Sequence, residues 1–240
     1  FLQNQMICDL NEGYAIYRPR YILPDYNVYI KKGCEFLELP APKNLDEVLD
    51  GLLILYSHVP SITTFPVYIG RLDMLLDPFI TDEEQDYIKI KRFLNHVDKT
   101  VPDSFCHANI GPYDTKAGRL ILKAVIELEA PTPNMTIRYD KSKTSREFAE
   151  LAAKACLLVS KPSFANDAYY ISDLGEQYGI ASCYNALPEC GGAYTLTRLR
   201  LGTIARACKT VDEMVNELLP RVAKCALSTI CLLYTSPSPR

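Results

Sequence analysis

The sequence predicts an α/β fold, on three observations. Helix starts are marked by capping boxes, in which Ser, Thr or Asn is followed three residues later by Glu. Short strand-like segments lie between the predicted helices, and this alternation is typical of α/β proteins. The composition, 48% hydrophobic and 23% charged over 240 residues, is that of an ordinary globular protein and argues against disorder.

Capping boxes predict four helices, in chain order. The boxes are Asn44/Glu47, Thr81/Glu84, Thr144/Glu147 and Thr210/Glu213. Behind the second and the third, apolar residues recur at helical spacing, as expected for helices with one buried face. They are Tyr87, Ile90, Phe93, Leu94 and Val97, and then Phe148, Leu151, Ala152, Ala155 and Leu158. The last helix is expected to begin near Val211 and to end or kink at Pro220.

The remaining elements are placed by pattern alone. A further helix is predicted from Thr115 to Glu129. Strands are predicted at Met135–Tyr139, at Gly179–Cys183 and at Tyr194–Leu201, the last because apolar and polar residues alternate along it. No Pro/Gly/Ser-rich linker interrupts residues 1–230, so we treat this range as one partial domain.

Charge, hydropathy and cysteine usage exclude several classes of protein. The net charge is −3 and no Lys/Arg cluster is long enough to follow a phosphate backbone, so nucleic-acid binding is not expected. No apolar run approaches the roughly 20 residues that cross a bilayer. The nine cysteines include no Cys-x-x-Cys pair and no clustered His, which argues against a zinc ribbon or a thioredoxin motif, and no metal site is predicted. Scattered cysteines without a disulfide framework indicate a reducing, cytoplasmic compartment.

Both ends of the chain indicate a fragment. It begins at Phe1 without an initiator Met, and residues 231–240 read as the translation of a sequencing-library adapter. A natural Ser/Pro-rich linker is the alternative explanation of that tail. We therefore expect a protein truncated at both ends, and we leave 231–240 out of the fold prediction.

The common catalytic motifs are missing from the sequence. It has no phosphate-binding loop, no dinucleotide fingerprint and no nucleophile elbow, and its three histidines, His58, His96 and His107, are isolated. Cys183 ends a predicted strand and precedes a polar loop, a position where reactive groups are often found. The residues alone nevertheless favour the ordinary role of a free cysteine, which is to pack as a small hydrophobe.

Three stretches of the chain carry a resemblance to a known superfamily. Pro131–Ile137 has the form Pro-x-Pro-Asn-x-Thr, Ser163–Asp167 follows it, and Cys183 with its loop precedes Thr197–Leu201. In this order and at this spacing they resemble the barrel-strand entry, the segment before the active cysteine, and the cysteine loop of glycyl radical enzymes. Pyruvate formate-lyase is the best-known member of that superfamily.

A closer resemblance covers nearly all of residues 1–230. Its segments are Ile7–Gly13, Tyr17–Tyr26, His58–Gly70, His107–Pro112 and Gly179–Pro188. Together these segments are similar to the YjjI family of glycyl radical proteins.

The resemblance implies a barrel of two half-sheets surrounded by helices, of which this chain would form a part. In the superfamily, a radical-SAM activating enzyme takes a hydrogen atom from a glycine near the C-terminus. The glycyl radical oxidises a cysteine thiol, and the thiyl radical attacks a small organic substrate. By position, Cys183 is that cysteine. No other bound cofactor is implied, and members are typically intracellular, oxygen-sensitive proteins that commonly form homodimers.

Six further residues are predicted to line the substrate pocket. They are Tyr184, Asn185, Glu189, Asn166, His107 and Asn109. Asn185 stands where the dehydratase and lyase branch has its general base, a Glu, and an amide cannot accept a proton usefully. Glu189 would replace that base only if the loop folds back, and a solvated loop carboxylate is the competing interpretation.

The reaction itself is left open. Cys183 lies between Ser182 and Tyr184, without a second cysteine, which argues against the acyl transfer of pyruvate formate-lyase. No radical-glycine segment follows Cys183, so the fragment itself is expected to be inactive although its parent is an enzyme. One variant of the enzyme interpretation is chemistry like that of anaerobic ribonucleotide reductase. Two other interpretations compete with it, a radical-domain-less binding subunit and a soluble α/β domain with Cys183 in its core.

Overall fold

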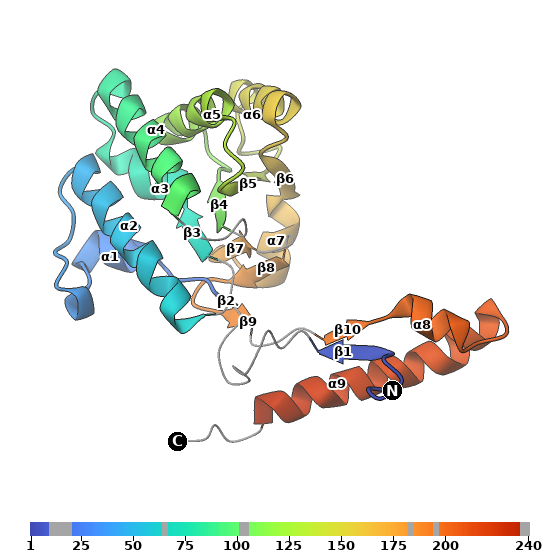
Figure 1. Ribbon diagram of the computed structural model, residues 1–240. Coiled ribbons are helices and arrows are strands. Elements are labelled where there is room, and N and C mark those ends of the chain that lie inside the picture. Colours follow the sequence, from blue (N-terminus) through green and yellow to red (C-terminus); the bar gives the residue numbers. More distant parts are fainter. Residues whose placement is uncertain (10–20, 64–66, 101–105, 182–184, 194–196, 236–240) are drawn as a thin grey trace. The chain divides into compact units, whose positions relative to one another are not determined.

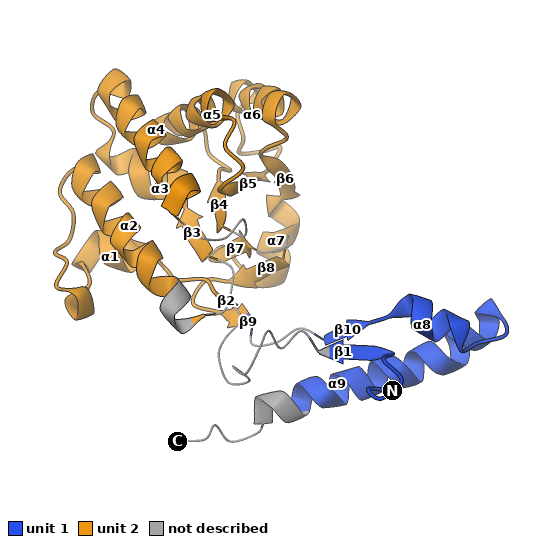
Figure 2. Cartoon of the chain, viewed as in Figure 1, with its two compact units in different colours: residues 1–20, 193–240 blue, residues 21–192 orange. Residues whose placement is uncertain are grey.

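The computed structural model describes residues 1–9, 21–63, 67–100, 106–181, 185–193 and 197–235. Contacts divide the chain into two compact units, one of residues 21–192 and the other of residues 1–20 with 193–240 (Figure 2). All the residues predicted to be functional belong to the larger unit by their position in the chain.

A parallel sheet forms the centre of the larger unit (Figure 1). Its strands are β3 (Val67–Arg71), β4 (Cys106–Ile110), β5 (Asn134–Tyr139) and β6 (Ser163–Asn166), hydrogen-bonded in the order β3-β4-β5-β6. Each neighbouring pair is parallel. Parallel strands need crossover connections, and helices supply them here.

Helices cover one face of this sheet (Figure 1). The long ones are α2 (Leu45–Ile62), α4 (Glu83–Thr100), α5 (Lys116–Leu128) and α6 (Arg146–Val159). The shorter ones are α1 (Asn27–Lys32) and α3 (Leu72–Leu76), with 3₁₀ turns at Glu35–Leu37 and Asp77–Phe79. Helix α7 (Asp167–Leu174) follows β6 and contacts β5, β7 and β8 instead. Helix α5 packs between α4 and α6, and one apolar core joins these helices to the sheet.

Every residue of β4 is buried, but alternate side chains face opposite sides of the sheet. Cys106, Ala108 and Ile110 belong to the apolar core under the helices, so His107 and Asn109 face the other side. On that side lies an antiparallel hairpin of β7 (Tyr178–Ala181) and β8 (Asn185–Pro188), and β7 contacts both β3 and β4. The sheet therefore lies between a helical layer and this hairpin.

The smaller unit is built around a two-stranded ladder and a long helix. Strand β1 (Ile7–Asp9) pairs antiparallel with β10 (Thr197–Leu199), and α8 (Leu201–Arg206) follows. The long helix has a π-helical part, Glu213–Leu218, that leads into α9 (Leu219–Thr235). The smaller unit has a small apolar core of its own, which includes Ile7, Ile204 and Val222. Strands β2 (Tyr21–Ile22) and β9 (Gly192–Ala193) stand where the chain passes from one unit to the other.

Two of the predicted capping boxes and the helix placed by pattern alone are confirmed. The side chain of Asn44 accepts a hydrogen bond of 3.0 Å from the backbone N–H of Glu47, and that of Thr210 accepts one of 3.1 Å from the backbone N–H of Glu213. The helix predicted from Thr115 to Glu129 is α5, with these two residues as its caps. The strand predicted at Met135–Tyr139 is β5.

The other two boxes are wrong by one residue. Asp82, not Thr81, accepts hydrogen bonds from backbone N–H groups in the first turn of α4, at 3.1 and 3.2 Å. Ser145, not Thr144, accepts the equivalent bond at the start of α6, at 3.1 Å. At both helix starts the sequence has two adjacent residues whose side chains can cap a helix, and the capping-box spacing alone does not tell which of the two does so.

Two predictions in the C-terminal part of the chain also need correction. The strand predicted at Tyr194–Leu201 is confirmed at β10, residues 194–196 lie outside the described residues, and Leu201 already begins α8. The helix does not end at Pro220, since α9 passes through this residue and continues to Thr235, within the tail left out of the prediction. Proline has no N–H to donate to the helix, and the π-helical hydrogen-bond pattern of Glu213–Leu218 just before it accommodates the missing bond.

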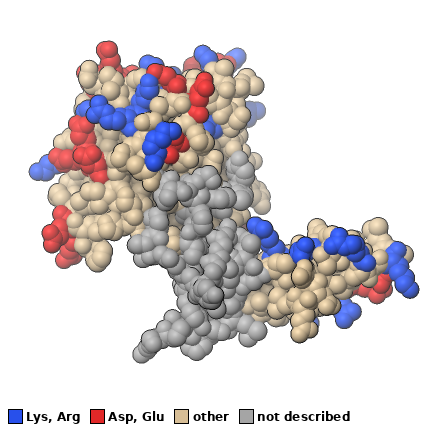
Figure 3. Space-filling view, in the orientation of Figure 1, with Lys and Arg blue, Asp and Glu red and all other residues tan. Residues whose placement is uncertain are grey.

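Charged side chains of both signs are interspersed over the helices of the larger unit (Figure 3). This distribution agrees with a net charge of only −3. Within the described ranges, no helix combines the length and the apolar character that crossing a membrane requires.

Candidate functional site

The face of the sheet that meets the hairpin is polar and buried, and we call it the polar face. Its fully or almost fully buried members are Tyr68, His107, Asn109, Thr136 and Arg138, whose exposed fractions are 0, 6, 0, 3 and 2%. Tyr68 stands beside His107 in the strand register, and Asn109 stands beside Thr136. Buried polar groups cost free energy unless they form hydrogen bonds, so the partners of these side chains indicate what the face does.

Asn109 fastens the hairpin to the centre of the sheet. Its Oδ1 accepts a hydrogen bond from the Ile180 N–H at 2.7 Å, and its Nδ2 donates one to the Ile180 carbonyl at 2.9 Å. A carboxamide matches both backbone groups of one residue, as a neighbouring strand would. Strand β7 is therefore held across the sheet by a side chain.

Arg138 fastens the beginning of β7 in the same way. Its Nη1 donates to the Tyr178 carbonyl at 3.2 Å and its Nη2 donates to the Glu176 carbonyl at 3.3 Å. Its Nε forms an ion pair with Asp167 at 2.7 Å, and the Tyr178 hydroxyl donates to the same carboxylate oxygen at 2.7 Å. The guanidinium also lies 3.8 Å from the centre of the Tyr178 ring. A buried charge needs this degree of pairing, so the ion pair and the hairpin root depend on each other.

Gly179 lets β7 approach the sheet closely. A Cβ atom at this position would lie 2.5 Å from the Tyr68 hydroxyl and 2.8 Å from Leu23. Tyr68 is fully buried, and burial raises the pKa of its phenol well above the ordinary value, so the hydroxyl stays protonated. A side chain at residue 179 would push the hairpin off the polar face.

His107 lies beside Tyr68 on the neighbouring strand, and one nitrogen atom of its ring lacks a hydrogen-bond partner among the described residues. Its Nε2 is buried and has no hydrogen-bond partner among the described residues. Burial lowers the pKa of this imidazole from 6.5 to about 4, so the ring is uncharged at neutral pH. An uncharged imidazole offers one donor and one acceptor to a ligand.

The two residues predicted at the tip of the hairpin, Cys183 and Tyr184, lie outside the described residues. The residues on either side of this segment, Ala181 and Asn185, are paired at the end of the β7–β8 ladder. The segment 182–184 is therefore the connection between the two strands that Asn109 and its neighbours hold.

The other predicted residues fall in different places. His107 and Asn109 lie together on the polar face. Glu189 follows β8 and is half-buried; burial, and then the Asp25 carboxylate, raise its pKa, while two arginines lower it. Asn185 is exposed and donates to the Tyr21 hydroxyl at 3.4 Å. Asn166 is exposed and its side chain caps α7, so its part in a pocket stays a prediction.

Sequence reasoning missed the residues that position the hairpin, chiefly Tyr68, Arg138 and Asp167. A signal was present for Arg138, since it is the one charged residue of an otherwise uncharged buried strand, β5. A charge in such a strand requires a partner. The sequence does not indicate which distant carboxylate supplies it.

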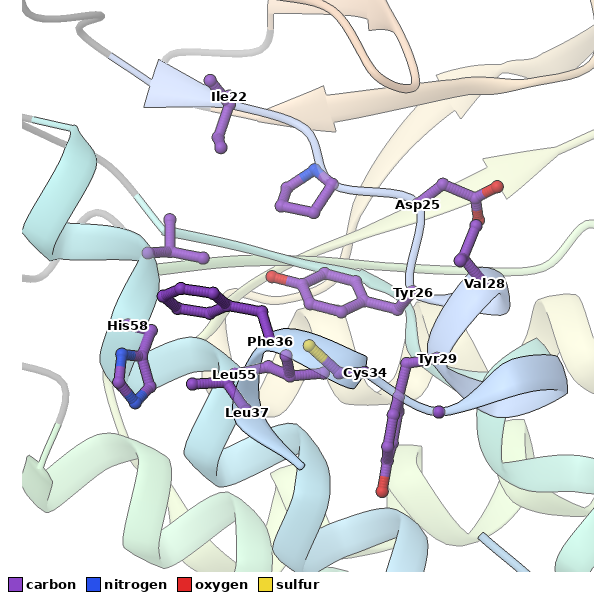
Figure 4. Close-up of a pocket in the computed structure, with 13 residues that line it drawn as sticks. Ile22, Asp25, Tyr26, Val28, Tyr29, Cys34, Phe36, Leu37, Leu55 and His58 are labelled. Atoms are coloured by element: carbon purple, nitrogen blue, oxygen red, sulfur yellow. The ribbon is translucent and has the colours of Figure 1, made fainter. Parts of the chain in front are cut away.

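The described residues offer few other sites. They contain no group of three or more His, Cys, Asp or Glu side chains placed to hold a metal ion. A separate apolar cavity of about 560 Å³ lies between the chain around α1 and helix α2, where Tyr26, Phe36, Leu55 and His58 lie around it (Figure 4). None of the predicted site residues lines this cavity.

Sequence comparisons agree over nearly the whole chain. The family model described as "Glycyl radical enzyme YjjI-like" matches residues 1–232. An "Uncharacterized protein" of Haemophilus influenzae is 92% identical over 230 residues, which are 96% of this chain and 45% of that protein. The "Uncharacterized protein YjjI" of Escherichia coli is 44% identical over 232 residues, which are 95% of this chain and 45% of that protein. The chain thus spans about half the length of the curated relatives it matches.

A solved structure has the same fold at low sequence identity. It is the anaerobic ribonucleotide reductase of Thermotoga maritima, with citrate in its active site, at a TM-score of 0.69 and 11% identity. The match covers 96% of this chain and 51% of that chain. The predicted fold class, an α/β fold that forms part of a glycyl radical enzyme barrel, is confirmed.

Replacing Asp167 by Asn should destabilise the larger unit by about 3–5 kcal/mol, because it leaves the Arg138 charge buried without its counter-ion. The double variant Arg138→Met/Asp167→Leu should recover the part of that loss that comes from the unpaired charge, but not the hydrogen bonds of Arg138 to the Tyr178 and Glu176 carbonyls. The control is Arg146→Gln, which breaks an ion pair on the surface of α6 and should leave the free energy of unfolding unchanged. Urea unfolding measures all three, and equal values for Asp167→Asn and the control would contradict the assignment.

The pH dependence of the free energy of unfolding should show that His107 is buried in its uncharged form. Its pKa falls from 6.5 to about 4 on folding, so between these values the unfolded chain binds a proton that the native ring does not. His107 alone therefore contributes a loss of stability of roughly 3 kcal/mol as the pH falls from 6.5 towards 4, and the raised pKa of Asp73, about 6, acts in the opposite direction. His107→Gln should remove this loss in urea unfolding, whereas His96→Gln, on the exposed side of α4, should keep it. A wild-type slope in His107→Gln would refute the assignment.

Proposed function

The chain belongs to the YjjI-like family of glycyl radical enzymes, and we propose that its parent protein uses Cys183 for thiyl-radical chemistry on a small organic substrate. One observation carries the proposal. The hairpin whose connecting segment contains Cys183 is fastened by Asn109 and Arg138 to a buried polar face of the sheet. Because the chain covers 45% of its relatives, the proposal concerns the whole protein.

The proposed step is a hydrogen-atom transfer. The Cys183 sulfur takes a hydrogen atom from the substrate, so that an S–H bond forms, a C–H bond breaks and the unpaired electron passes to carbon. The glycyl radical of the family, outside this chain, supplies the oxidising equivalent. Such a step needs a fixed distance between sulfur and carbon and the exclusion of water and oxygen.

The described residues support both requirements. Asn109, Arg138 and Tyr68 are each no more than 2% exposed, and they fix the backbone of β7 from Tyr178 to Ile180. His107 adds a polar group without a partner, which is available to a substrate hydroxyl or carbonyl. We assign Asn109 and Arg138 to positioning and His107 to substrate contact.

The proposal extends to partners and setting. A radical-SAM activating enzyme would install the radical, and the whole protein would act as a cytoplasmic, oxygen-sensitive homodimer. The reaction type stays open, because the likeness to ribonucleotide reductase at 11% identity concerns the fold alone. Tyr184, Asn185 and Glu189 stay predicted pocket residues beside Cys183.

Deuterium exchange into the glycyl radical tests Cys183 without a known substrate. In D₂O a thiol becomes S–D, so a cysteine that exchanges hydrogen atoms with the glycine replaces the glycine α-hydrogen by deuterium. The doublet of the glycyl EPR signal should then collapse in the activated full-length protein. It should also collapse in the control Cys190→Ala, which removes an exposed thiol beyond the hairpin. In Cys183→Ala the signal should persist as a doublet, and collapse in that variant would refute the assignment.

A further inference from the structure

Two buried nitrogen atoms of the sheet have no hydrogen-bond partner among the described residues. They are Nε of Arg71 and Nε2 of His107. Such atoms are rare in folded proteins, because a buried donor or acceptor without a partner costs about 1–3 kcal/mol. Each therefore indicates a partner that the described residues do not provide.

A bulge in β3 places both atoms on the same side of the sheet. Tyr68 pairs with His107, and the next recorded pair joins Arg71 to Asn109, so β3 contains one extra residue between the two pairs. Gly70 takes up the bulge with a φ of +83°, and a Cβ atom there would meet Tyr26 and Leu75 in the apolar core. Arg71 consequently shares the polar face with Asn109 and stands at the carboxyl end of β3. Ligands of parallel α/β sheets commonly bind at that end of the strands.

Arg71 differs from Arg138, the other arginine of this face, in having no ion-pair partner among the described residues. Arg138 is paired with Asp167, whereas Arg71 forms no ion pair with any residue that the structure describes. Its one hydrogen bond is a long one, from Nη2 to the Gly111 carbonyl at 3.4 Å. A half-buried guanidinium with a free Nε–H is suited to a carboxylate, which binds the fork of N–H groups with two oxygens.

The neighbouring carboxylates do not fill this role. Asp73 is fully buried, and it accepts hydrogen bonds from the backbone N–H of Gly111 at 2.7 Å and of Met74 at 2.8 Å. Burial raises the pKa of Asp73 to about 6, partly offset by these bonds and by Arg71. Glu189 is half-buried, and Arg71 lowers its pKa, but no ion pair or hydrogen bond joins these two described residues.

We propose that Arg71, at the carboxyl end of β3, binds the carboxylate of a small organic acid. His107 lies diagonally from Arg71 in the strand register, beyond the hydrogen bond from Tyr68 to Asn109, and is not assigned to this carboxylate. This inference rests on the proposed function and names its substrate class. Glu189 competes with the ligand for Arg71, so its negative charge weakens binding.

The test compares lactate with lactamide, which have nearly the same shape and differ in charge. Both are titrated into the full-length protein before activation, and the ¹⁵N–¹H signal of Arg71 Nε is followed by NMR. Lactate should shift this signal and bind at least about tenfold more tightly than lactamide. Arg71→Gln should abolish the preference and Arg71→Lys should keep part of it. Glu189→Gln should strengthen lactate binding. Arg92→Gln, on the exposed surface of α4, should bind as the wild type does.

Equal binding of the two compounds by the wild type, or no binding of either, would overturn the proposal. So would an unchanged preference in Arg71→Gln. Binding requires no radical, so either result leaves the role of Cys183 untouched. Conversely, a failure of deuterium exchange at the glycine would reject the thiyl role and leave the carboxylate site standing.

Discussion

The structure depends on side chains that hold a hairpin against the inner face of a parallel sheet. Neighbouring strands of a sheet are joined by backbone hydrogen bonds, but β7 crosses β4 and has no ladder with it. Asn109 supplies the missing partners for Ile180, and Arg138 supplies those for Tyr178 and Glu176. The bonds to Ile180 and Tyr178 are buried, so the root of the hairpin has little freedom to move.

This arrangement explains why one face of the sheet is polar although it is buried. The helical face needs only apolar side chains, because the helices satisfy their own backbone groups. The opposite face must satisfy the backbone of β7 and the charge of Arg138, so it carries Asn, Asp and Tyr side chains. Arg71 and His107 are the members of this face that retain unsatisfied nitrogen atoms. In our proposals, structural support and ligand binding are thus divided among neighbouring residues of the same strands.

Local chemistry made much of the fold predictable. The apolar stripe of α4 and the cap at Thr115 follow from spacing along the chain, and both are present. Predictions failed where two neighbours could serve equally, as at Thr81 and Asp82, or where an irregular turn accommodates a proline, as before Pro220. The site was predictable only in part. Resemblance pointed to His107 and Asn109, whereas the pairing of Arg138 with a carboxylate 29 residues away depends on tertiary structure.

Hydrogen exchange at the Ile180 amide tests the central claim most directly. In Asn109→Leu, which keeps a side chain of similar size without the carboxamide, this amide loses its only acceptor on the sheet. The account predicts that its protection falls by at least about tenfold while the amides of β5 keep theirs, and that Asn185→Ala, at an exposed position of β8, changes neither. Unchanged protection of Ile180 in Asn109→Leu would contradict the account, because the hairpin would then be held by something else.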